Sequence, residues 1–446
     1  MLLKKHPISS IAALSALLFA QSALAADTLT DALTGGKASA NLQYRYEDVK
    51  TGAVVAPGVT TNVATANTVR LRLGYETAQF KGFGAMVEVE STHDLGNKKY
   101  NGGNNGNAAY AQILDPEVTE INQAYLSYSG LANTTVKAGR QRLILDNARF
   151  VGNVGWRQNE QTFDALTVVN KSLTNTTVTV GYLTNANRVI GDGVTTTDAG
   201  NAHMKSPIIN VKYSGWSLAD IVGYAYLLDY DPVGVAKGGS ATTNNNSSDT
   251  YGIRLNGSAP MGGNKLLYTA EFAEQRDGSN HANNYKTSYT LLEAGVDVTG
   301  IAIFKLGYEV LGNDDGATAK VGGAAAVTSF QTPLATLHAF NGWADMFLTT
   351  PTTGLKDTYV SANGKLAGIA LGAVYHDYRA DGNTAAGAAD LGNELNLVAS
   401  YNFEKNYTLG LKYADYKAGG VVAATGVGNG AKSNTKKTWL WGEFKF

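Results

Sequence analysis

Short segments in which apolar and polar residues alternate recur along the whole chain, and the last of them ends it. Residues 438–446 read TWLWGEFKF, so Leu440, Phe444 and Phe446 share one face of an extended strand. Charged and Trp side chains share the other face. A strand between lipid and a wet interior needs two such faces, because each meets a different solvent. For this segment alone, an edge strand of a soluble sheet is the alternative.

The first 25 residues have the pattern of a cleaved export signal. Lys4 and Lys5 precede an apolar run, and Ala23-Leu24-Ala25 gives a small-x-small cleavage site. The run is shorter than the roughly 18 residues of a spanning helix, which argues against a membrane anchor. Without Lys4 and Lys5, the 36 basic residues become 34 against 37 acidic ones, a net charge of −3. Such a chain has no global basic field for nucleic acid.

Two kinds of connection separate the alternating segments. Tight connections are predicted at Lys81-Gly82, 130–133, 171–175, Gly215, 259–264, Gly300, Asn363-Gly364 and 404–406. Long connections, rich in Gly, Asn, Ala and Thr, are predicted near 50–64, 93–117, 146–160, 186–205, 231–249, 276–285, 313–355, 381–391 and 418–435. Short turns at one end and long loops at the other are typical of outer-membrane barrels.

These connections predict about 18 strands, with 16 as the alternative. Beyond the leader no continuous apolar run is long enough for a spanning helix, so only a closed barrel could cross a membrane. A β-helix would show a fixed short repeat, and none is found. We therefore predict an all-β protein with a signal peptide (1–25), a short periplasmic segment (26–37) and one antiparallel transmembrane barrel (38–446). Its predicted location is the outer membrane of a Gram-negative cell, which the absence of cysteine fits.

Arginines on the polar faces of the predicted strands and in the third long loop are the candidate pore-lining residues. A charge that faces lipid near the midplane costs roughly 2–4 kcal/mol, so these side chains should point inward. The set comprises Arg45, Arg70, Arg72, Arg140, Arg142, Arg149, Arg157 and Arg254. Either they recognise carboxylates or phosphates, which suits the guanidinium fork, or they form an internal ion-pair ladder with acidic residues such as Glu47, Glu88, Glu90 and Glu160.

The phase of Arg140 and Arg142 needs a special explanation. Both share the parity of Val136, an apolar residue expected to face lipid. A one-residue bulge at Gly139 could reset the phase. Alternatively, the pair lies above the bilayer at the strand end.

Two long connections contain apolar residues unlike those of a solvated tip. One includes Phe150 and Trp156, and the other includes Phe340, Trp343 and Asp345. Apolar loop residues normally pack on something. One hypothesis is that both segments fold inward and narrow the pore. The alternative is a hydrophobic cap in which loops pack on one another over the rim.

At these segments the chain resembles the alginate export family of outer-membrane β-barrels. The resemblance rests on GRQ at 139–141, DNARFVG at 146–152, WRQN at 156–159, QTFDA at 161–165, HAFNGWAD at 338–345, LTTP at 348–351 and GLKD at 354–357. It implies an eighteen-stranded barrel that passes a polyanionic polysaccharide or related solute through an arginine-lined lumen. Arg140, Arg142, Arg149 and Arg157 match the family's motifs. The slightly acidic charge of the mature chain departs from that of a dedicated polyuronate exporter.

Enzyme and metal interpretations have little support. His93-Asp94 and His376-Asp377 are adjacent on predicted strands, where neighbours point to opposite faces. Asp314 and Asp315 have the pattern of exposed turn acids. We predict no catalytic activity, no cofactor and no metal site.

The predicted function is passive passage of small or anionic solutes, acidic oligo- or polysaccharides among them. The alternative is a structural or adhesive barrel with a closed lumen. The predicted partners are outer-membrane lipid and lipopolysaccharide, a saccharide or small anionic solute, and the barrel-assembly machinery, which would recognise Phe446.

Overall fold

The chain folds into one large antiparallel sheet. The structure, a computed structural model, describes residues 26–52, 62–96, 98–105, 107–192, 200–232, 246–278, 280–320, 328–382, 390–419 and 433–446. The predicted leader and parts of several long loops lie outside these residues. In the described part, no helix has the length and apolar character needed to cross a membrane.

The sheet has 18 strands, and each pairs with the next along the chain. They are β1 (Lys37–Thr51), β2 (Val63–Glu76), β3 (Phe83–Asp94), β4 (Val118–Tyr128), β5 (Thr134–Gln141), β6 (Thr162–Asn170), β7 (Thr176–Asn187), β8 (Asn201–Tyr213), β9 (Ala219–Leu228), β10 (Ser248–Met261), β11 (Asn264–Asp277), β13 (Lys286–Val298), β14 (Ala302–Leu311), β16 (Leu355–Leu366), β17 (Ile369–Arg379), β18 (Asp390–Phe403), β19 (Tyr407–Lys417) and β20 (Thr435–Lys445). A separate pair, β12 (Asn283–Asn284) and β15 (Thr318–Ala319), lies outside this sheet. Among the described residues there are also two short helices, α1 (Leu29–Thr34) and the 3₁₀ helix η2 (Leu337–Ala339).

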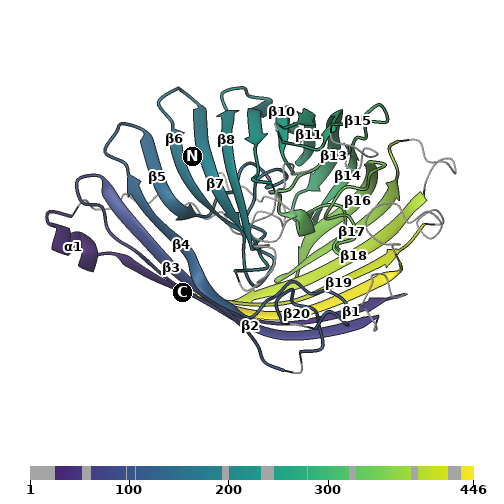
Figure 1. The fold of residues 1–446 in the computed structure, drawn as a ribbon, viewed down its shortest axis with the longest axis horizontal. Helices are drawn as coiled ribbons and strands as arrows, with labels where there is room; N and C mark the ends of the chain where they lie inside the picture. Colours follow the sequence, from purple (N-terminus) through teal and green to yellow (C-terminus); the bar gives the residue numbers. More distant parts are fainter. Residues whose placement is uncertain are drawn as a thin grey trace.

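Pairing between the first and last strands closes the barrel. β20 runs antiparallel to β1, with Phe444 opposite Leu42 and Trp441 opposite Arg45. In Figure 1 purple β1 lies beside yellow β20, and the strands surround a common interior. Closure leaves no strand edge unpaired, which a bilayer requires. The predicted eighteen-stranded all-β barrel is confirmed.

Alternation divides the side chains between an outer and an inner face. On β14, Phe304 and Leu306 are about half exposed, whereas Glu309 is 4% exposed. On β1, Leu42 is exposed while Arg45 is buried. The outer face is therefore apolar, and the inner face carries the charges, as the strand periodicity predicted.

Glycines on the inner face make room for large rings. A Cβ added at Gly410 would lie 2.0 Å from Cζ2 of Trp441, its partner on the neighbouring strand. A Cβ at Gly307 would lie 2.1 Å from Cζ of Tyr359. These rings therefore cover the backbone of the adjacent strand, which only a residue without a side chain permits.

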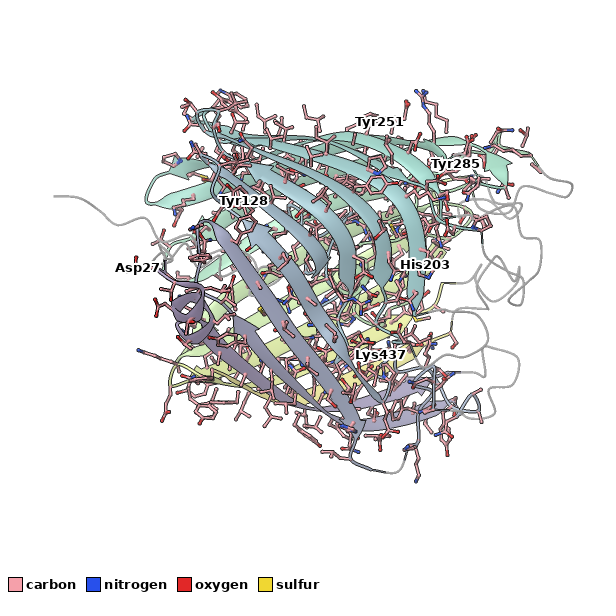
Figure 2. The ribbon with its side chains drawn as sticks, turned by 60° about the vertical axis from the view of Figure 1, so that its left-hand side comes forward. Asp27, Tyr128, His203, Tyr251, Tyr285 and Lys437 are labelled. Atoms are coloured by element: carbon pink, nitrogen blue, oxygen red, sulfur yellow. The ribbon has the colours of Figure 1, made fainter. Side chains whose placement is uncertain are left out.

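The two ends of the barrel differ as expected. Figure 2 shows α1, beside the labelled Asp27, at the same end as the turn that follows Tyr128.

One predicted turn is displaced: Asn363 and Gly364 still pair within β16 and β17, and the chain reverses at Ala367-Gly368. Both turn residues have positive φ, at 49° and 85°. The sequence Asn-Gly suggested the wrong site because register, set by inward and outward packing, extends both strands beyond it.

Candidate functional site: two long connections inside the barrel

Two long connections, residues 142–161 and 328–354, bind each other through their backbones. The N–H of Gly152 donates to the carbonyl of Leu334 (2.9 Å), and the N–H of Thr336 donates to the carbonyl of Ala148 (3.0 Å). The side chain of Gln161 donates to Leu334 as well, at 3.1 Å. Figure 1 shows chain crossing the barrel interior between the walls. The segments thus form one unit, called here the inner loops.

Aromatic packing holds the inner loops against the wall. Phe150 contacts Tyr224 and Tyr289, with ring centroids 5.2 and 5.3 Å apart. Both tyrosines lie on the inner face and are buried. On the other side of the barrel, Trp156 packs at right angles to Trp441, at 5.5 Å. Because these partners belong to β9, β13 and β20, the inner loops lie within the barrel and not as a cap over its rim.

Arg149 is the deepest anchor of this unit. It is 2% exposed, and its Nε lies 2.7 Å from the carboxylate of Glu309 on β14. A second guanidinium nitrogen donates to Asn341 (3.0 Å), whose own amide donates to Glu309 and to Asp357. One arginine therefore connects both inner loops to β14 and β16. Burial disfavours its charged form, but Glu309 outweighs this and raises the pKa of Arg149.

Asp345 is the second anchor, and it lies between three basic groups. Its Oδ2 accepts from Arg157 (3.0 Å) and Lys437 (2.7 Å), and its Oδ1 lies 2.6 Å from Nδ1 of His338. Burial would raise the pKa of Asp345, but these neighbours hold it well below its usual range. Burial lowers the pKa of His338 to about 3 against the effect of Asp345. A neutral His338 can donate from Nδ1 and accept at Nε2 from Lys412, 2.7 Å away.

Tryptophans surround the ammonium group of Lys412. Its Nζ lies 3.8 Å from the ring centroid of Trp343 and 4.1 Å from that of Trp156. Cation–π attraction stabilises a charge that is largely removed from water. The two loop tryptophans that the sequence singled out thus meet on a wall lysine that it did not. Alternation on β19 would have placed Lys412 inward, opposite Trp439.

The remaining arginines also bind carboxylates. Arg142 contacts Glu160 and Glu88, and Arg72 contacts Glu90 and Glu160. Arg45 pairs with Asp115, Arg70 with Glu443, Arg157 with Glu47 as well as Asp345, and Arg254 with Glu271. Of these, Arg142 is the most open to solvent, at 28% of its side chain. These contacts build the internal ion-pair ladder, which the sequence left as one of two alternatives.

Arg140 does not share a face with Arg142, so that prediction is wrong. Register runs without a break through Gly139 and Arg140, and the bulge is absent from this part of β5. Arg140 has the parity of Ala138, whose partner Leu126 is 66% exposed on the outer face. It pairs with Asp164 at the long-loop end of the strand, 2.8 Å away. Arg142 follows the end of β5, where the chain turns inward.

Lys137 is another inner-face cation, besides Lys412, that the sequence interpretation missed. Lys137 shares β5's inner face with Gly139, and its Nζ contacts the hydroxyl (3.2 Å) and ring of Tyr125. Within the described ranges it has no carboxylate in ion-pair distance. Its strand parity was the available signal, but a bulge that would reset the phase of this strand was one of the two alternatives left open for Arg140 and Arg142.

The histidine and acidic residues considered as catalytic or metal-binding candidates do not come together in one site. His376 binds Asp357 on the neighbouring strand at 2.9 Å, while Asp377 faces outward and pairs with Arg379. Asp314 accepts from the backbone of Gly316 (2.8 Å), as a turn residue does. Among the described residues, no group of three or more His, Asp and Glu is placed to hold a metal ion.

Comparison with known protein families identifies the family to which this barrel belongs. The sequence pattern of the alginate export family matches residues 38–310, more than half of the chain. The chain belongs to the alginate export family. No curated protein matches it in sequence. Membership in this family and the closed barrel place it in the Gram-negative outer membrane as a channel for small solutes.

Solved outer-membrane proteins share the fold at low sequence identity. Acinetobacter baumannii OccAB2 is 12% identical, with a TM-score of 0.68 over 93% of this chain and 99% of that one. Pseudomonas aeruginosa OccK9 (OpdG) is 14% identical, with a TM-score of 0.66 over the same shares. Pseudomonas aeruginosa OpdK, solved with vanillate, is 12% identical, with a TM-score of 0.65 over 93% and 99%.

Replacing Arg149 tests the first anchor. Arg149→Met leaves Glu309 buried without its cation, and we expect a loss of about 3–5 kcal/mol in the free energy that docks the inner loops. Hydrogen–deuterium exchange over residues 330–345 should rise. The control is Arg379→Met, which removes an exposed pair worth about 0–1 kcal/mol. Equal exchange in the two variants would show that Arg149 is not an anchor.

Acid should weaken the second anchor. Docked His338 has a pKa near 3 against 6.5 in free histidine, so the undocked form gains a proton as the pH falls below 6.5. Between pH 7 and pH 5 this difference amounts to about 2 kcal/mol in favour of undocking. His338→Gln keeps polar contacts without titrating, so its unfolding temperature should fall less over this interval. Circular dichroism melts at both pH values measure this, and equal falls would contradict it.

Proposed function

We propose that this channel passes small anionic organic solutes, acidic saccharides among them, by passive diffusion and without chemical change. The observation that carries the proposal is a basic track along β5. Arg142 at the strand's end and Lys137 within it both face the interior, and both are partly exposed. Arg72, on β2, adds a third partly exposed cation beside Arg142, since both contact Glu160.

The ion-pair ladder limits how strongly such a track can attract anions. Glu160 is buried, and although burial raises its pKa, Arg142 and Arg72 lower it overall, so it stays charged and offsets them. Among the described residues, no carboxylate lies close enough to offset the positive charge of Lys137 in the same way. A solute carboxylate would therefore meet moderate positive potential, which suits transient contact during passage better than tight binding.

The structural or adhesive barrel remains the second candidate. It is favoured by the number of arginines already bound to carboxylates of the chain, because a paired guanidinium is not available to bind a solute. Conductance in a planar lipid bilayer separates the two functions, because a closed lumen would carry no current.

Neutralising the basic track tests the proposal. In Lys137→Gln/Arg142→Gln, we expect the ratio of anion to cation permeability to fall about two- to fivefold, as for partly screened charges. Reversal potentials under a potassium chloride gradient measure this ratio. The matched control is Arg276→Gln, which removes an arginine that is 58% exposed on the outer face. The proposal fails if both variants keep the wild-type ratio.

We also propose that lipopolysaccharide surrounds the long-loop end and that the assembly machinery binds Phe446. The backbone of Phe446 pairs with Ala40 (2.9 and 3.2 Å), but its side chain is 72% exposed on the outer face. The ring is therefore available to a partner without loss of strand pairing.

Phe446→Ala should lower the amount of folded barrel in the outer membrane of living cells. The purified variant should still refold into lipid vesicles at the wild-type yield, because the backbone contacts with Ala40 remain. Lys445→Ala is the control. A normal level of Phe446→Ala in cells, measured by heat-modifiable gel migration, would refute the role of the ring.

A further inference from the structure

An aromatic ring lies flat on the inner wall at Tyr359. A Cβ added at Gly307 would lie 2.1 Å from Cζ of Tyr359 and 2.5 Å from both Cε1 and Cε2. These equal distances put that point over the ring face, because an in-plane position beyond Cζ is occupied by the hydroxyl oxygen. One face of the ring therefore covers the backbone of β14. The opposite face is turned towards the interior beside the ring of His376, which is tilted by 42° with its centroid 5.6 Å away, and Tyr359 is partly exposed.

Register explains why the ring can lie this way. Glu293 on β13, Gly307 on β14 and Tyr359 on β16 form one row across three strands. All three lie on the inner face, since the alternating neighbours Leu306 and Val360 are exposed on the outer one. Without a side chain at Gly307, Tyr359 reaches across β14, and its hydroxyl donates to Glu293 at 3.0 Å.

Polar groups of both kinds flank the ring. Glu293 accepts from Lys305 at 2.7 Å, and their side chains are 17% and 21% exposed. The carboxylate offers acceptor oxygens and the ammonium offers donors, beside a flat apolar surface. The pair is neutral as a unit, so it does not favour a strongly charged ligand. We call Tyr359, Glu293 and Lys305 the Tyr359 shelf.

The Tyr359 shelf lies next to the inner loops. Two residues further along the same strands, Glu309 and Asp357 both accept from Asn341 of the loops. The shelf therefore lies two residues along β14 and β16 from this anchor, closer to the short-turn end of the barrel. A solute that passes the inner loops along this wall would meet the shelf.

We propose that the Tyr359 shelf is a saccharide-binding subsite that takes one pyranose ring. A pyranose presents a face of C–H groups, which are attracted to the negative face of an aromatic ring. Its equatorial hydroxyls lie at the rim, where Glu293 accepts and Lys305 donates. An aromatic solute would use the ring but leave this pair unmatched, whereas a hydroxylated ring uses all three groups. This subsite rests on the proposed channel function and narrows its solutes to saccharides.

Current block by a neutral sugar tests the subsite. Maltotetraose added on the short-turn side of the full mature chain in a planar bilayer should interrupt the current in a concentration-dependent way. In Tyr359→Ala we expect the dissociation constant of block to rise about three- to tenfold. Tyr359→Phe keeps the ring and should stay within about twofold of the wild type. Tyr375→Ala, which removes an outer-face tyrosine that is 45% exposed, should change nothing.

Gly307→Ala provides a variant that keeps Tyr359. The added Cβ must lift the ring from the wall, so block should weaken as in Tyr359→Ala. Heat-modifiable migration and unchanged sugar-free conductance establish that each variant is folded. Equal block in wild type, Tyr359→Ala and Gly307→Ala would overturn the subsite. So would block of the wild type no stronger than that by polyethylene glycol of equal size.

The two proposals fail in different ways. Loss of the channel function appears without sugar, as absent conductance or as a permeability ratio insensitive to Lys137 and Arg142. Failure of the subsite leaves both of these intact and appears only in the sugar titration.

Discussion

Closure of the sheet between β1 and β20 is the constraint on which the other features depend. A closed barrel has one interior, and every inward side chain of 18 strands must be accommodated there. Charges excluded from lipid by the outer face are therefore concentrated in a limited space. They are tolerated because they pair. An unpaired buried charge destabilises the fold by several kcal/mol, whereas a buried ion pair with good hydrogen bonds can leave the stability unchanged.

Pairing gives the arginines a different role from the one that their chemistry first suggests. A guanidinium fork can bind a solute carboxylate, but Arg149 and Arg157 are more than nine-tenths buried. They hold the inner loops to Glu309 and Glu47 of the wall, and Arg157 also joins the two loops through Asp345. Their specificity for carboxylates is satisfied within the chain. The groups that retain contact with solvent, such as Arg142 and Lys137, lie at the margin of this network. Solute contact and loop anchoring are thus divided between deep and shallow members of one set of cations.

The wall opposite β5 has a different chemistry. The Tyr359 shelf combines an aromatic face with a neutral Lys305–Glu293 pair, whereas β5 presents cations. A solute that combines a carboxylate with a hydroxylated ring has groups suited to both walls. The charge balance of the chain, with a formal net charge of −1, agrees with local basic sites and disagrees with an interior that is basic throughout.

The sequence by itself determined the barrel, because a two-residue period and the alternation of short and long connections leave few other folds. It also selected Phe150, Trp156, Trp343 and Asp345, since apolar and acidic residues stand out in Gly- and Asn-rich loops. Only the tertiary structure decided which carboxylate each arginine binds, that Arg140 faces outward, and that Tyr359 lies flat over Gly307. These facts depend on register and on contacts between residues far apart in the chain, which local periodicity does not encode.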